Sequence, residues 1–188
     1  GWFGFNGGSE LVVSNESAAI AVSQVFLNTN MAAAGGVVAA IITSLVLTGK
    51  MDVTMAMNGA IAGLVSITAS PSAPSAGIAL LIGAAGGALV YFSILYFDKR
   101  LKLDDPVGAI SAHGIVGILG VMVVPFTSDA SFIWQAIGVI SISGFSFFAS
   151  LGTILLINNF MPIRASDEEQ DVGLDLSEIG VEAYPDFK

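Results

Sequence analysis

His113 is the only histidine in the 188 residues, and it is the side chain best suited to proton chemistry. It lies in a stretch without charged residues that runs from 106 to 128. A neutral imidazole has one donor and one acceptor, so it can hold a small polar molecule and relay a proton. Ionisable groups at membrane depth usually mark a pathway or a buried partner. Position alone leaves two readings open: a pathway histidine, or a structural histidine bonded to a neighbouring carbonyl.

Other residues with chemical potential indicate weaker sites. The adjacent acids Asp104 and Asp105 precede Pro106 in a basic loop, so we expect them to cap a helix and pair with that loop. One histidine supports no nucleophile–base pair that the sequence shows, and the chain has no cysteine. We therefore expect no enzyme, no metal site and no cofactor.

The composition is that of a membrane protein. Apolar residues make up 54% of the chain and charged residues 11%, whereas soluble domains carry about 25% charged residues. More than half of the 15 acids follow Arg164, so the net charge of −9 describes the tail rather than the body. Six basic residues cannot form a phosphate-binding face, which excludes a nucleic-acid partner.

Long runs without charge predict five helices that cross the lipid bilayer, because about 20 apolar residues span its core. We expect an all-α, polytopic helical bundle in a membrane domain over 10–163, with spans at about 24–48, 53–69, 76–97, 106–126 and 131–161. Residues 1–9 fit the end of a preceding transmembrane helix. The small residues at 32–36 and the pair Gly59 and Gly63 predict close helix packing. Asn28 and Thr29 either face a pore or cross-link helices, and we favour the cross-link.

The loops orient this arrangement. With alternating spans all basic residues fall on one side: Lys50, Lys99, Arg100, Lys102, Arg164 and Lys188. By the positive-inside rule that side is cytoplasmic. The acidic tail over 164–188 is therefore predicted to be cytoplasmic, on a multi-pass protein of the cell membrane.

Four stretches together resemble the ammonium transporter (Amt/Rh) family, on its Amt branch. They read Gly-Trp-Phe-Gly-Phe-Asn at 1–6 followed by Ser9, Asn-Gly-Ala-Ile-Ala-Gly-Leu-Val at 58–65, Asp-Asp-Pro at 104–106 with His-Gly-Ile-Val-Gly at 113–117, and Gly-Leu-Asp at 173–175 with Glu-Ala-Tyr at 182–184. The resemblance implies an eleven-helix fold of two inverted five-helix repeats plus a last helix. On that map the chain is expected to be the C-terminal half: the second repeat, the last helix and the tail.

The resemblance also implies roles for four residues. His113 resembles the second of two paired pore histidines, and Trp2 the pore-lining tryptophan beside that pair. Phe5 resembles one of two stacked gate phenylalanines, and Ser9 the hydroxyl that helps recruit ammonium. The partners of these residues belong to the first repeat. A homotrimer with one pore per subunit is implied as well.

The implied function is ammonium or ammonia transport. An outer aromatic and hydroxyl site would recruit the ion, and ammonia, with or without a relayed proton, would pass the histidines. The alternative is an ammonium sensor that uses the same fold and signals through its tail. PII-type proteins dock on the cytoplasmic face of some members. Here Ile-Gly-Val at 179–181 replaces the family's His-Gly-Glu, which affects any regulation through the tail rather than the pore.

Overall fold

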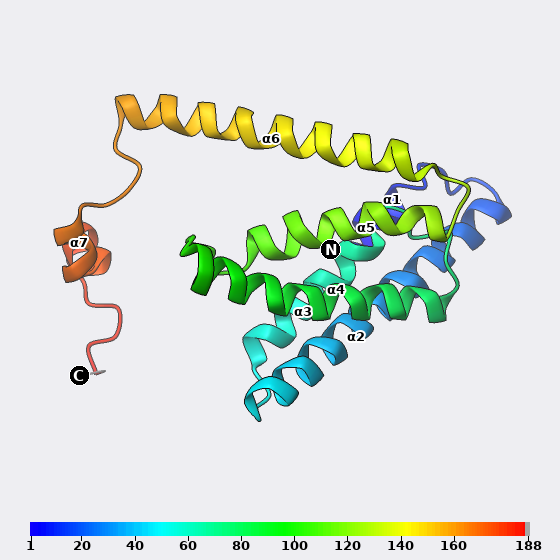
Figure 1. Cartoon of the computed structure of the whole chain (residues 1–188), viewed down its shortest axis with the longest axis horizontal. Coiled ribbons are helices and arrows are strands. Elements are labelled where there is room, and N and C mark those ends of the chain that lie inside the picture. Colours follow the sequence, from blue (N-terminus) through cyan, green and yellow to red (C-terminus); the bar gives the residue numbers. More distant parts are fainter. Residues whose placement is uncertain (187–188) are drawn as a thin grey trace. The chain divides into compact units, whose positions relative to one another are not determined.

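The computed structural model describes residues 1–186, and within them every regular element is helical, which confirms the all-α prediction (Figure 1). Lys188, one of the six basic residues in the orientation argument, lies outside the described residues, as does the end of the predicted tail. The chain divides into two compact units, one over Gly1–Ser141 and one that begins at Ile142.

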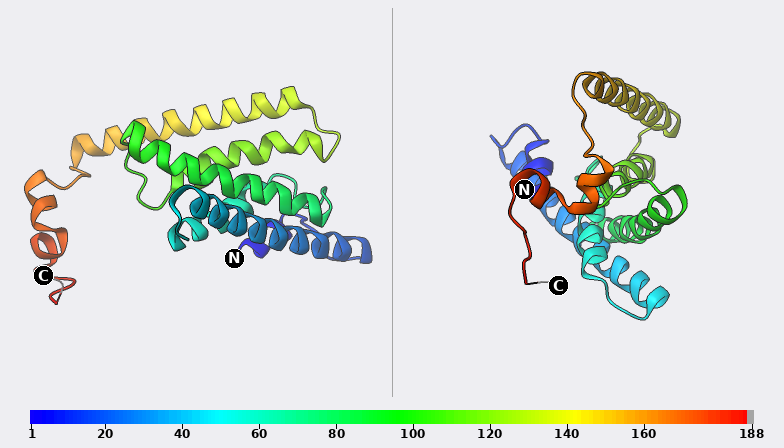
Figure 2. Two further views of the ribbon diagram at one scale, coloured as in Figure 1. Left: turned by 60° about the horizontal axis from the view of Figure 1, so that its bottom comes forward. Right: turned by 90° about the vertical axis from the view of Figure 1, so that its left-hand side faces the viewer.

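The first unit contains most of the helices. They are α1 (Trp2–Gly8), α2 (Glu16–Thr48), α3 (Val53–Ile67), α4 (Ala76–Tyr96), the π-helical turns η1 (Phe97–Leu101) and η2 (Ile110–Ile115), α5 (Val116–Val123) and the 3-10 turn η3 (Val124–Phe126). The views of Figure 2 show α2, α3, α4 and α5 running beside one another. The long helix α6 (Phe132–Phe160) starts in this unit and continues into the second, where α7 (Asp167–Val172) and the π-helical turn η4 (Asp175–Ile179) follow.

Three helices within residues 1–186 are long and apolar enough to cross a membrane. They cover Glu16–Thr48, Ala76–Leu101 and Phe132–Phe160. The other two predicted spans form shorter apolar helices, Val53–Ile67 and Ile110–Phe126. The five-span arrangement therefore stays a prediction.

Backbone-to-backbone contact holds α2, α3 and α4 together, as the small residues predict. A Cβ atom added to Gly36 would meet the Gly59 carbonyl, and one added to Gly63 or Gly83 would meet the Ala32 carbonyl. No side chain larger than hydrogen fits at these three glycines without a backbone shift. The predicted close approach at 32–36 and at the Gly59/Gly63 pair is confirmed.

Buried polar side chains link the same helices. Asn28 of α2 is fully buried, and its Nδ2 donates to the carbonyls of Pro71, at 2.9 Å, and Pro74, at 2.7 Å, in the loop between α3 and α4. Thr29 Oγ1 accepts from Asn6 Nδ2 of α1 at 2.9 Å. These three bonds join separate segments of the chain, which is the cross-linking role expected for Asn28 and Thr29.

The tail is more ordered than a solvated linker. Ser166 and Glu169 form a reciprocal capping box that starts α7, with the Ser166 backbone N–H donating to the Glu169 carboxylate at 2.7 Å. This backbone bond first, and the Ser166 hydroxyl second, lower the pKa of Glu169 below its ordinary value. The Ala183 N–H, which donates to the Asp175 carboxylate at 2.8 Å, likewise lowers the pKa of Asp175.

Candidate functional site

The first side of the candidate site is carried by the short helix α1, which presents Trp2 and Phe5. Asn6 holds this helix against α2 through the buried bond to Thr29. The rings of Phe3 and Phe26 also meet edge to face, with centroids 5.5 Å apart. Seven residues would not stay helical alone, so these contacts with α2 fix where Trp2 and Phe5 lie.

The second side is the helix of His113, whose start is defined by Asp105. The carboxylate accepts hydrogen bonds from the backbone N–H groups of Ile110, at 3.1 Å, and Ser111, at 3.2 Å, and from the Ser111 hydroxyl. Between them Gly108 has a φ of 71°, a left-handed conformation that favours glycine. The helix therefore begins at Ile110 instead of the expected Pro106, and the capping role predicted for Asp105 is confirmed.

His113 lies inside η2, the π-helical turn, a form that is rare and frequent at functional sites. The neighbouring Ala112 is buried in a cluster with Ala62, Val90 and Val116. The His113 imidazole itself is exposed in this chain.

The two sides meet where the Trp2 indole stacks on the imidazole. The ring centroids are 6.2 Å apart and the planes are inclined by 15°. Phe5 continues the row, with its ring centroid 5.9 Å from that of Trp2. The structure thus brings together three of the four predicted site residues, from segments more than 100 positions apart.

A hollow of about 300 Å³ lies beside this stack. Its lining is apolar apart from one indole, one hydroxyl and one imidazole, and it comprises Trp2, Val65, Thr68, Ala69, His113, Gly117 and Val121. No carboxylate or ammonium group lines it. Such a lining disfavours a bare ion and suits a small neutral molecule.

Ser9, the fourth predicted residue, does not line the hollow. It follows α1, is exposed, and its hydroxyl donates to the Phe5 carbonyl at 2.8 Å. Its oxygen retains acceptor capacity, which an ammonium ion above Phe5 could use. The structure therefore places Ser9 next to Phe5 and apart from His113.

Thr68 is the residue that sequence reasoning missed. Its Oγ1 accepts from Trp2 Nε1 at 2.8 Å and donates to the Leu64 carbonyl at 2.7 Å. Thr68 directly follows α3, three residues after the motif at 58–65 ends. A hydroxyl at the end of this apolar helix is the available signal, but Ser66 and Ser70 give the same signal, so the sequence does not single out Thr68.

Metal binding finds no support in the described part of the chain. No group of three or more histidine, cysteine, aspartate or glutamate side chains there could hold a metal ion.

Comparison with known proteins gives consistent matches over nearly the whole chain. The model of the Ammonium Transporter Family matches residues 1–184. The "Ammonium transporter" of Bacillus subtilis (strain 168) is 33% identical, with 99% of this chain and 49% of that protein covered. "Ammonium transporter Amt2" of Archaeoglobus fulgidus is 35% identical, with 100% and 43% covered. The chain thus spans about half the length of the curated relatives it matches.

Solved structures give the same likeness. A structure titled "Sensor Amt Protein" superposes with a TM-score of 0.85 at 34% identity, covering 94% of this chain and 45% of that one. Candida albicans Mep2 superposes with a TM-score of 0.79 at 24% identity, covering 89% of this chain and 41% of that one. The second likeness concerns the fold alone.

Proposed function

The chain belongs to the ammonium transporter family, and from that premise we propose that the full-length protein conducts ammonia, derived from ammonium, past His113. The family is one of transporters, not enzymes, and its fold is a polytopic bundle of membrane helices. The stack of Trp2 on His113 beside an apolar hollow carries the proposal.

Recruitment of the ion falls to Phe5 and Ser9. The Phe5 ring is 72% exposed, so its face is open to a cation. A cation–π contact contributes roughly 0.5 to 2 kcal/mol, and the Ser9 oxygen adds an acceptor next to it. This site holds ammonium in its charged form before the ion meets the apolar hollow.

Deprotonation follows because the hollow offers no counter-charge. Desolvation of a bare ammonium ion costs on the order of tens of kcal/mol in an apolar medium, so the ion transfers its proton instead, either to water at the outer site or to the His113 imidazole. Neutral ammonia can then accept a hydrogen bond from one imidazole nitrogen or donate to the other. His113 acts as the polar contact within the apolar path, and a second histidine outside this chain completes the pair that the resemblance implies.

The remaining parts of the full-length protein complete the path. The relatives are about twice as long as this chain, so the exposed faces of Phe5 and His113 have room for a covering half. The homotrimer implied by the resemblance remains part of the proposal.

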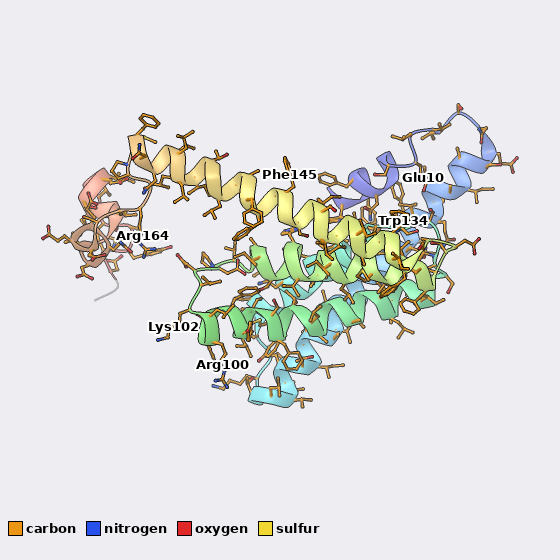
Figure 3. All side chains as sticks on the ribbon, turned by 45° about the horizontal axis from the view of Figure 1, so that its top comes forward. Glu10, Arg100, Lys102, Trp134, Phe145 and Arg164 are labelled. Atoms are coloured by element: carbon orange, nitrogen blue, oxygen red, sulfur yellow. The ribbon has the colours of Figure 1, made fainter. Side chains whose placement is uncertain are left out.

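The proposed orientation places the C-terminus in the cytoplasm of a cell-membrane protein. Figure 3 shows Arg100 and Lys102 where α4 passes into the following loop, and Glu10 at the opposite end of the first unit. Basic residues gathered at one end support a cytoplasmic assignment for that end. A PII-type regulator would dock there. A pull-down with full-length protein and with a variant lacking 165–188 tests the tail, and equal binding would exclude its role.

Ammonium transport is tested in proteoliposomes that hold the full-length protein. An ammonium jump is followed by the charge movement and by the luminal pH, with protein-free liposomes as the reference for passive ammonia entry. The wild type should give a current or faster alkalinisation, and His113→Ala should lose or alter it. Ile118→Ala is the matched control, because Ile118 is on the same helix and does not line the hollow. Equal signals from wild type and His113→Ala would make His113 structural.

An ammonium sensor is the second candidate, favoured by the likeness to the structure titled "Sensor Amt Protein". The same experiment separates the two. A folded wild type that binds ammonium but gives neither current nor extra alkalinisation would indicate a sensor. Transport lost with His113→Ala would indicate a transporter.

A further inference from the structure

The hydrogen bond between Trp2 and Thr68 uses the indole N–H, which the stack of Trp2 on His113 leaves free. Trp2 Nε1 is a donor only, and it points to Thr68 Oγ1 at 2.8 Å. The Thr68 hydroxyl proton is directed to the Leu64 carbonyl at 2.7 Å, which turns the oxygen lone pairs toward the indole. Thr68 therefore faces Trp2 as a fixed acceptor.

The polar groups around the hollow can be counted in full. Val65, Ala69, Gly117 and Val121 offer no polar side chain, which leaves the indole, the threonine hydroxyl and the imidazole. The first two satisfy each other. The imidazole is then the one side-chain group of this lining with an unused donor, and the Thr68 oxygen keeps one acceptor lone pair.

We propose that Thr68 is a specificity-determining residue that keeps water out of the hollow. It does so by accepting the hydrogen bond of the Trp2 indole N–H, so that this donor is not free to hold a water molecule. This inference rests on the proposed function of the same site. A bare indole N–H would be a strong donor toward the lone pair of ammonia and toward water. It would retain ammonia beside His113, and it would give water a second side-chain donor in a hollow where the imidazole otherwise supplies the one that is free.

Thr68 acts on the substrate through its bond to Trp2, so it is a positioning residue as well. Its bond fixes the plane of the indole, which lies 15° from the imidazole plane. Loss of the acceptor frees the ring to turn about its side-chain torsions. The stack of Trp2 on His113 and the hydrogen bond of the indole N–H are therefore lost together.

The test uses four variants of the full-length protein in proteoliposomes. Thr68→Val keeps the shape of the side chain but removes the hydroxyl acceptor. Thr68→Ala removes the acceptor and also reduces the side-chain volume, whereas Thr68→Ser retains the acceptor. Thr43→Val is the matched control, because Thr43 donates to its own helix at Ala39 in the same way but touches no residue of the hollow. Three readouts are taken: osmotic water permeability, ammonium transport, and the Trp2 indole N–H resonance, which is assigned from its absence in Trp2→Phe.

We expect Thr68→Val and Thr68→Ala to move the indole resonance upfield, raise water permeability several-fold and slow ammonium transport several-fold. Thr68→Ser and Thr43→Val should remain at wild-type values. Water permeability unchanged in a folded Thr68→Val or Thr68→Ala, or a Thr68→Ser that behaves like them, overturns the proposal. If the wild type transports no ammonium but Thr68→Val still admits water, the proposed function fails and the role of Thr68 stands.

Discussion

Glycines occur both in the helices α2–α4 and in α6, and the two groups have different surroundings. A Cβ atom at Gly36, Gly63 or Gly83 would meet the backbone of a neighbouring helix. At Gly138, Gly144 and Gly152 of α6, nothing lies within 4 Å of the same position. No residue of α6 is buried, whereas each of α2, α3 and α4 has several.

The difference teaches that small residues permit helix contact but do not specify it. Association in lipid depends on van der Waals contact between surfaces that can approach closely. The surface of α2 at 32–36 meets matching small residues on α3 and α4. The glycines and serines of α6 offer a similar surface, and its apolar side chains, such as Trp134 and Phe145 (Figure 3), are exposed.

The largest expected effect comes from adding one methyl group to a packed glycine. Gly83→Ala should lower the free energy of unfolding by about 3 kcal/mol, because a helix backbone must move to admit the methyl group. Gly144→Ala, the matched change in α6, should stay within about 1 kcal/mol, since alanine favours helix and nothing is displaced. Unfolding of the full-length protein in denaturing detergent measures both. Similar losses of unfolding free energy in Gly83→Ala and Gly144→Ala would contradict the difference between the packed and the exposed glycines.

A smaller effect is expected from the polar links. Asn28→Ala leaves the carbonyls of Pro71 and Pro74 without their buried donor and should cost about 2 kcal/mol. Asn158 of α6 only accepts from the exposed Ile163 N–H, so Asn158→Ala should cost well under about 1 kcal/mol. The same unfolding measurement ranks them. An Asn28→Ala protein as stable as wild type would show that water replaces the amide.

The Asp105 cap of the histidine helix should contribute less to the free energy of unfolding than the Asn28 links do. Asp105→Ala removes the acceptor for the Ile110 and Ser111 N–H groups and should cost about 1 kcal/mol. Because the start of η2 loosens, the Trp2–His113 stack should weaken as well, seen as a shifted Trp2 indole resonance. Asp104→Ala is the control. A resonance shift of equal size in Asp105→Ala and Asp104→Ala would show that the Asp105 cap does not control the Trp2–His113 stack.

The smallest effect concerns the exposed tail and depends on pH. The pKa of Glu169 is lowered in the folded tail below its ordinary value of 4.5. Above pH 4.5 the carboxylate is therefore ionised and the capping box contributes its full stability. Stability from this group is lost as pH falls through the folded pKa. Exchange protection of the tail amides should decline on acidification below about 4.5, and Ser166→Ala should abolish that dependence. An unchanged pH dependence in Ser166→Ala would assign it to Asp175.

Sequence patterns predicted the contacts that depend on residue size and local spacing. The glycine spacing at 59 and 63 predicted close packing, and the family motifs led to Trp2, Phe5 and His113, which meet in the structure. The motif around His113 is one of the four stretches that together carried the family resemblance. These features are visible because each depends on residue types within one short stretch.

Features that depend on backbone conformation or on distant partners were not predictable in the same way. The helix start at Ile110 requires the positive φ of Gly108 and a carboxylate that reaches forward from Asp105, whereas proline at the first helical position is the commoner pattern. Thr68 meets Trp2 across 66 positions of sequence. In the tail, α7 starts at a capping box between Ser166 and Glu169.

A π-helical turn is what one inserted residue produces in a longer α-helix, so the spacing between His113 and its neighbours depends on chain length as well as composition. His113 lies within η2, whereas Gly117 and Val121 lie in α5, and all three line the hollow. An in-frame deletion of the codon for Gly114 would relax this turn to α-helix and change the angle at which the imidazole stands relative to α5. Such a deletion would separate the histidine from its hollow although every lining residue were still encoded.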